Sequence, residues 1–198
     1  MSTAQLVRDH VAGVPERSFV SSSELNAPSH AVDCELSRLS DRRELVRVRK
    51  GLYWKGSRTR AGMTGPPAMQ AGLEVAGDGA GPAEFSAAAA LGLTTQVPSV
   101  EVVAVPGRRR VPPRGVRFVL RSVERRIRQL SFVEVAVIEL LLDGPRFIEV
   151  PWSRAAEAIA LHARDGSIRV SVIAEQLADE RHLAARDRWQ QLGLRERV

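Results

Sequence analysis

The stretch covering residues 29–55 most constrains the fold, because its hydrophobic period changes partway along it. Its first part predicts a helix over residues 29–41, since apolar residues recur there at i, i+4 and i+7. From Val46 onward apolar residues alternate with arginines, and Lys50-Gly51 supplies a turn before a second short strand. A polar-faced helix followed by a basic ribbon is typical of a winged helix-turn-helix. In that fold the helix enters the DNA major groove and the ribbon contacts the backbone beside it.

Shorter elements before residue 29 complete this prediction. Residues 3–12 predict a helix, Phe19-Val20 an extended segment, and residues 21–25 a short second helix ending before Pro28. Ser29 is expected to cap the third helix. These elements define a DNA-binding domain over residues 1–56, followed by a flexible, partly basic linker over residues 57–65 and a second domain over residues 66–198.

The second domain is predicted to be mainly helical with a small sheet. Strands are expected at 100–105 and 116–120, forming a hairpin with an arginine-rich tip. Helices are expected at 67–76, 82–91, 131–142, 152–163, 168–177 and 179–192. The predicted fold class of the whole chain is therefore α+β.

Charge is unevenly distributed along the 198 residues, whose formal net charge is +6. Residues 1–60 contain eleven Lys or Arg against seven Asp or Glu, and residues 106–130 contain nine against one. These two basic blocks favour an anionic partner. A single cysteine rules out an intrachain disulfide, the N-terminus is polar, and the longest apolar run is too short to cross a bilayer. We therefore expect a cytoplasmic protein without a membrane partner.

Ten side chains of the first block are candidates for contacting DNA. Arg38 is the best candidate for guanine because a guanidinium donates two hydrogen bonds at once, and Asp33 is expected to orient it or to select cytosine. Arg42 and Arg43 could contact phosphate or complement the helix dipole, and the helix face could instead be merely solvated. The ten candidates are Ser29, His30, Asp33, Ser37, Arg38, Arg42, Arg43, Arg47, Arg49 and Lys50.

The second basic block has two interpretations of equal weight. Its arginines could contact nucleic acid or an acidic protein surface, or they could form a solvated loop that charge keeps soluble. They are Arg108, Arg109, Arg110, Arg114, Arg117 and Arg121.

Catalytic motifs are missing from the sequence. The four histidines show no metal-ligand spacing with cysteine or carboxylates, and there is neither a G-x-S-x-G elbow nor a Walker loop with its lysine. We therefore predict a non-enzyme with no catalytic residues, no metal and no cofactor.

Two segments together resemble the AbiEi family of antitoxins from type IV toxin–antitoxin systems. They are LSRLSDRRELVRVRKGLYWKG and the later GPAEFSAAAALGLTTQVPSVEVVAVPGR. The resemblance implies a winged domain that binds repeats in the promoter of its own operon and represses it. It also implies a C-terminal domain that neutralises a nucleotidyltransferase toxin encoded next door, by direct contact or indirectly. The alternative is a stand-alone winged-helix regulator whose second domain binds a ligand or a partner.

Overall fold

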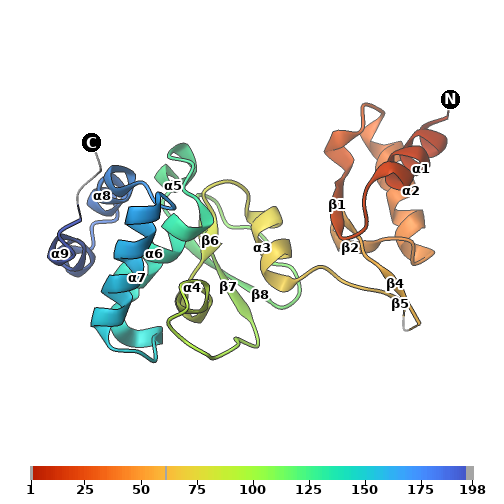
Figure 1. Cartoon of the computed structure of the whole chain (residues 1–198). Coiled ribbons are helices and arrows are strands. Elements are labelled where there is room, and N and C mark those ends of the chain that lie inside the picture. Colours follow the sequence, from red (N-terminus) through yellow and green to blue (C-terminus); the bar gives the residue numbers. More distant parts are fainter. Residues whose placement is uncertain (1, 61, 195–198) are drawn as a thin grey trace. The chain divides into compact units, whose positions relative to one another are not determined.

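The computed structural model describes residues 2–60 and 62–194 and divides the chain into two compact units. Unit 1 is Met1–Pro67 and unit 2 is Ala68–Val198. Each unit contains both helices and a small sheet (Figure 1), which confirms the predicted α+β class.

Unit 1 alternates helices with strands of one antiparallel sheet. Its elements are α1 (Thr3–Gly13), β1 (Ser18–Ser21), a 3-10 turn (Ser22–Glu24), α2 (Ser29–Asp41), β2 (Val46–Arg49) and β3 (Leu52–Lys55). The strand order is β1-β3-β2, so the chain returns through β3 to pair with both other strands. The predicted helix 29–41 is confirmed, but Pro28 and not Ser29 occupies its N-cap, without a capping side-chain hydrogen bond.

A single hydrophobic core holds unit 1 together. Val7 and Val11 of α1 pack against the apolar stripe of α2, and Tyr53 of β3 closes the core from the sheet side. The stripe consists of Val32, Leu36 and Leu39, which are at most 3% exposed. The i, i+4, i+7 spacing of the sequence is therefore the packing surface of this helix.

The segment predicted to be a flexible linker is partly structured. It contains a short two-stranded hairpin, β4 (Arg58–Thr59) and β5 (Gly62–Met63). Ser57 N–H donates to Thr64 Oγ1 at 2.9 Å and Thr64 N–H donates to the Ser57 carbonyl at 3.0 Å, and these two bonds close the base of the β4–β5 hairpin. Regular structure therefore continues beyond the predicted domain end at residue 56.

Unit 2 is built on a three-stranded sheet in the order β6-β7-β8. The strands are β6 (Gly81–Pro82), β7 (Glu101–Pro106) and β8 (Val116–Arg121). The predicted hairpin of the last two strands is wrong, because β7 and β8 run parallel, with Glu101 opposite Val116 and Pro106 opposite Arg121. Residues 107–115 must therefore travel back along the whole strand, and they cannot form a tight turn.

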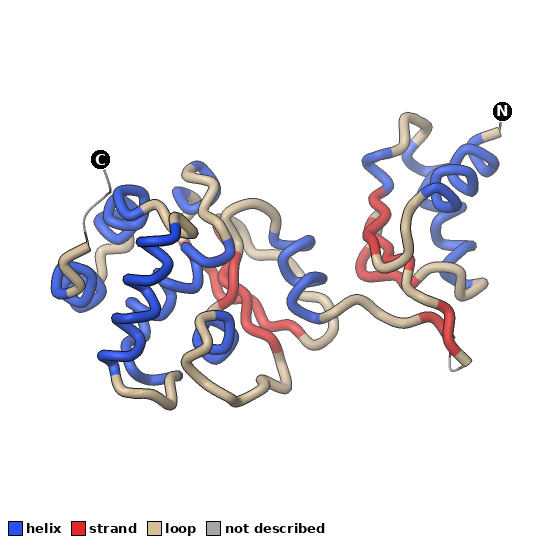
Figure 2. The backbone as a smooth tube through the Cα atoms, in the orientation of Figure 1, coloured by secondary structure: helices blue, strands red, loops and turns tan. Residues whose placement is uncertain are grey.

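Helices cover both faces of this sheet (Figure 2). On one face α3 (Ala68–Ala76) packs on Val103, Val105 and Val116, and Gly72 permits the close approach, because a Cβ there would lie 3.0 Å from two of these valines. On the other face α4 (Glu84–Ala90) and α6 (Phe132–Asp143) pack against Val102 and Ala104. Successive side chains of β7 therefore point to opposite faces of the sheet and pack into two different cores.

The C-terminal helices enclose α6, which lies at the centre of the larger core. A capping box between Ser131 and Glu134 starts α6, and Gly144, with a φ of +66°, follows its end. The remaining elements are α5 (Glu124–Ile127), a 3-10 turn (Gly144–Phe147), α7 (Trp152–Asp165), α8 (Val170–Asp179) and α9 (Leu183–Gln191).

Candidate nucleic-acid interface

The exposed side of α2 is a narrow stripe of polar residues at a spacing of four. His30, Cys34 and Arg38 lie on it, and Arg42 follows at the C-terminal end of the helix. The Cys34 side chain is exposed, with Sγ 3.8 Å from Nδ1 of His30. Cys34 therefore belongs to the surface that the sequence assigned to DNA contact.

Two predicted contact residues lie on the flank of this stripe. Asp33 and Ser37 are half-buried and face the ribbon, where Asp33 Oδ1 has no hydrogen-bond partner and Ser37 bonds to Tyr53. Burial raises the pKa of the Tyr53 phenol, so that this side chain stays neutral at physiological pH. Asp33 therefore lies on the side of α2 that faces the turn between β2 and β3, and it does not pair with Arg38.

Glu35, and not Asp33, bonds to Arg38 in the structure, so of the two roles expected for Asp33 only the first, orienting Arg38, is taken by another residue. The Glu35 side chain is 2% exposed, and Oε2 accepts from Arg38 Nη1 at 3.3 Å while Oε1 accepts from Arg8 Nε at 2.9 Å. Burial alone would raise the pKa of the Glu35 carboxyl, but the hydrogen bonds and charges of the two arginines lower it below the ordinary value. A buried anion therefore joins α1 to the exposed face of α2.

Five exposed cations continue the surface beyond α2. Arg47 and Arg49 point away from the core on β2, because Val46 and Val48 occupy its inward positions. Lys50 lies in the turn, and Gly51, with a φ of +75°, provides the left-handed turn conformation. Within the described part of the chain, no ion pair engages these five side chains: Arg42, Arg43, Arg47, Arg49 and Lys50.

The second basic block separates into exposed and internally bonded arginines. Arg117 pairs with Glu84, Arg121 binds both carboxylate oxygens of Glu139 at 2.7 Å, and Arg110 donates to the Val75 carbonyl at 2.6 Å. Arg110 and Arg121 are thereby half-buried against unit 2, whereas the paired Arg117 is still 51% exposed. The other three, Arg108, Arg109 and Arg114, are exposed on the segment between β7 and β8.

A buried charge cluster near this block was missed by sequence reasoning. Arg125 is 0% exposed and donates to Glu139 at 2.6 Å and to Glu180 at 2.7 Å, which ties α5 to α6 and α8. Burial would raise the pKa of the Glu139 carboxyl, yet Arg125 and Arg121 hold it below its ordinary value. The only sequence signal was Glu139, an acidic residue inside the apolar run from Val135 to Leu142.

The ALGLTTQ segment, which carries part of the family resemblance, closes a loop onto Glu149. Gly92 follows the end of α4 with a φ of +69°, and Glu149 then accepts hydrogen bonds from Thr95 N–H at 2.7 Å and from the Gln96 amide at 2.9 Å. These bonds lower the pKa of Glu149 to about 2. The segment therefore has a structural role in this chain.

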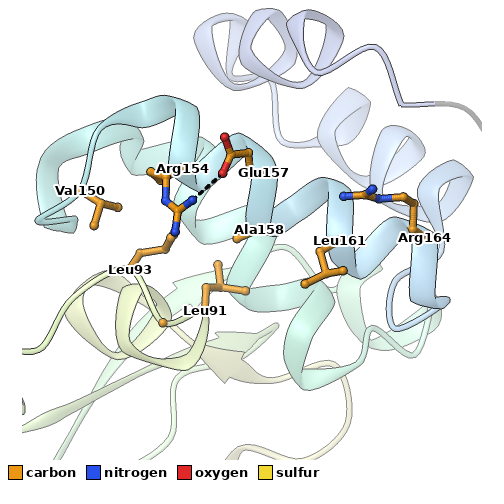
Figure 3. A pocket seen from close by; sticks show the side chains of 9 residues that line it. Leu91, Leu93, Val150, Arg154, Glu157, Ala158, Leu161 and Arg164 are labelled. Atoms are coloured by element: carbon orange, nitrogen blue, oxygen red, sulfur yellow. Dashed lines mark hydrogen bonds and ion pairs between the residues drawn. The ribbon is translucent and has the colours of Figure 1, made fainter.

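The same segment forms one wall of an open groove of about 490 Å³ (Figure 3). The opposite wall is a stripe of α7, on which Leu161 is 56% exposed and Arg154 pairs with Glu157 at 2.9 Å. The groove is lined by Leu91, Gly92, Leu93, Val150, Arg154, Glu157, Ala158, Leu161 and Arg164. It contains no cluster of catalytic or metal-ligating groups.

Comparison with known proteins leaves the family open. No protein-family model matches the sequence, and neither does any curated protein. Among solved structures, the crystal structure of the RV2827C protein from Mycobacterium tuberculosis is similar at a TM-score of 0.47 and 16% identity, over 96% of this chain and 75% of that chain. A likeness this distant carries no argument about function.

Two further properties concern the described residues. None of their helices combines the length and apolar character needed to cross a lipid bilayer. They also contain no group of three or more His, Cys, Asp or Glu side chains placed to hold a metal ion.

Proposed function

We propose that this protein is a DNA-binding antitoxin of the AbiEi type, which represses its own operon and neutralises a cognate nucleotidyltransferase toxin. The observation that carries the DNA-binding half is the exposed polar stripe of α2 beside five cations without an ion-pair partner in the described chain. Phosphate contacts from such cations give affinity, and a helix face gives base contacts. The element order and the β1-β3-β2 sheet of unit 1 also support a winged helix-turn-helix.

The antitoxin half of the proposal rests on the resemblance of residues 81–108 and on the separate compact unit that contains them. It is tested by growth rescue: the neighbouring nucleotidyltransferase gene is expressed with and without the full chain. Rescue supports an antitoxin. Failure of rescue, together with sequence-specific DNA binding, would leave a stand-alone regulator.

The DNA-binding half predicts the effect of removing the two ribbon arginines. Arg47→Ala combined with Arg49→Ala should weaken binding to all duplexes alike and reduce the slope of log K against log salt by about 1.8, since each lost phosphate contact contributes about 0.9. The measurement is a fluorescence titration of a labelled duplex from the upstream region of the gene at several salt concentrations.

A matched control removes two exposed arginines of unit 2, Arg164→Ala with Arg181→Ala, and changes the net charge equally. The control should retain wild-type binding and salt slope. Equal losses in both double variants would mean that total charge, and not the ribbon, governs binding.

A further inference from the structure

We propose that Glu35 is a positioning residue for base recognition: it holds the Arg38 guanidinium in the orientation that reads a guanine in the major groove. This inference rests on the proposed DNA-binding function. It assigns sequence selectivity to a side chain that is itself too buried to contact DNA.

The geometry around Glu35 gives each carboxylate oxygen its own arginine. Arg8 places both Nε and Nη2 at 2.9 Å from Oε1, and Arg38 places Nη1 at 3.3 Å from Oε2. The Arg38 side chain is nevertheless 68% exposed. Glu35 therefore bonds one edge of the Arg38 fork and leaves the remaining N–H donors facing outward.

Recognition of guanine requires two donors of one planar fork to meet O6 and N7 together. A free arginine on a helix surface has many rotamers, and ordering it on binding costs conformational entropy. An Arg38 guanidinium that Glu35 already holds loses less conformational entropy when it binds a base. It is also kept from turning toward a neighbouring phosphate. The anchor itself has little freedom to move, because the Glu35 side chain is 2% exposed and packed inside unit 1.

No other ion pair in the described chain involves Arg38, so Glu35 is its electrostatic anchor. The charged groups around the carboxylate are the two arginines, and both lower its pKa after burial has raised it. Glu35 therefore remains an anion over the pH range of a DNA-binding experiment. Glu35→Gln keeps the side-chain volume and removes the charge.

The test uses the full chain and a pool of randomised 20-base-pair duplexes. Wild-type protein first selects its preferred sequence, and Arg38→Ala identifies the base pair whose discrimination depends on Arg38. At that base pair wild type should prefer the selected base by roughly 5- to 150-fold. In Glu35→Gln this preference should fall to within about threefold, with the salt slope unchanged.

Two variants separate positioning from folding and from charge. Arg8→Gln breaks the same tie between α1 and α2 but leaves the Arg38 contact, so it should lower the denaturation midpoint like Glu35→Gln and keep base preference. Glu157→Gln removes a carboxylate from an exposed pair in unit 2 and raises the net charge equally. It should leave both properties unchanged.

Each outcome decides the inference. Loss of preference in Glu35→Gln alone supports it. Retained preference in Glu35→Gln, equal loss in Arg8→Gln, or unchanged preference in Arg38→Ala overturns it while sequence-specific binding stands. If wild-type protein selects no sequence, then the inference and the base-specific binding in the proposed function fail together.

Discussion

Arginine side chains in this protein differ in what they bond to, and that difference decides which of them are available to a partner. Arg121 and Arg125 bond to Glu139 inside unit 2, whereas Arg47 and Arg49 are exposed on the ribbon. Removing one partner of the buried group would leave an uncompensated charge, which costs far more than breaking an exposed pair. A count of basic residues along the sequence therefore overstates the surface that can bind an anion.

Sequence reasoning distinguished these two kinds of arginine only where the local pattern was informative. On β2 the alternation of valine and arginine placed Arg47 and Arg49 outside correctly, since one face of a strand must be buried. Arg38 bonds to Glu35 and not to Asp33, although Glu35 lies three residues before it on the same helix and this i, i+3 spacing was already visible in the sequence. The bonds of Arg121 and Arg125 depend on contacts between distant elements, which no local pattern records.

Asp143 makes the stability of the fold depend on pH. Burial and the neighbouring Glu139 charge raise its pKa to about 6, although Arg121 opposes them, and its Oδ2 atom has no hydrogen-bond partner. Between about pH 4 and pH 6 the folded protein thus keeps a proton on this carboxyl that the unfolded chain has released. Its contribution is favourable below about pH 4 and is lost as the pH rises through about 6.

Asp143→Asn imitates the protonated form and should stabilise the fold at pH 7 by roughly 1–2 kcal/mol, because solvent screens part of the effect at this half-buried site, with the gain disappearing near pH 4. Urea denaturation of wild type and variant between pH 4.5 and 7.5 measures this difference. Asp187→Asn changes an exposed carboxylate of α9 and serves as the control. A gain that does not vary with pH would show that Asp143 is not protonated in the folded protein.

At the scale of elements, most helices were predicted, although the short helix α5 was missed and α9 begins four residues after its predicted start, and the connection between the last two strands was predicted wrongly. Helices with a clear apolar stripe, such as α2 and α7, begin at their predicted residues and end within two residues of their predicted ends. The pairing of β7 with β8 was wrong, because two short apolar strands read the same whether they run parallel or antiparallel. Only the path of residues 107–115 past α3 decides between them, and that path depends on tertiary contacts such as the Arg110 bond to Val75.

The loop after α4 should depend on Glu149. Glu149→Ala removes the acceptor for Thr95 and Gln96, so the amides of residues 94–97 should exchange faster with solvent. Hydrogen-exchange mass spectrometry at pH 7 measures this effect. The wild-type loop should keep its protection down to about pH 4, because the pKa of Glu149 is about 2.

A matched control removes an exposed carboxylate from α8, Glu175→Ala, and should leave this loop unchanged. Equal protection of residues 94–97 in Glu149→Ala and wild type would show that the backbone of the loop, and not the carboxylate, fixes its conformation.

At the scale of the whole molecule, unit 1 and unit 2 have separate hydrophobic cores. Leu36→Ala truncates a buried side chain of unit 1, and Leu141→Ala truncates one of unit 2. Each substitution should lower the free energy of unfolding by about 2–5 kcal/mol. Residue-resolved hydrogen exchange should show lost protection only in the unit that carries the substitution. Loss across both units in either variant would mean that the two cores unfold as one cooperative system.

The pairing of β1 with β3 has a consequence for how the protein is made. Every strand of unit 1 finds its partner within the first 67 residues, so the sheets of this unit can form before most of unit 2 has been translated. Domains fold as units during synthesis, at about 5–20 residues per second. Under the proposed function, a nascent chain still attached to the ribosome would carry a folded unit 1 several seconds before unit 2 is complete, and DNA binding would become possible before toxin neutralisation.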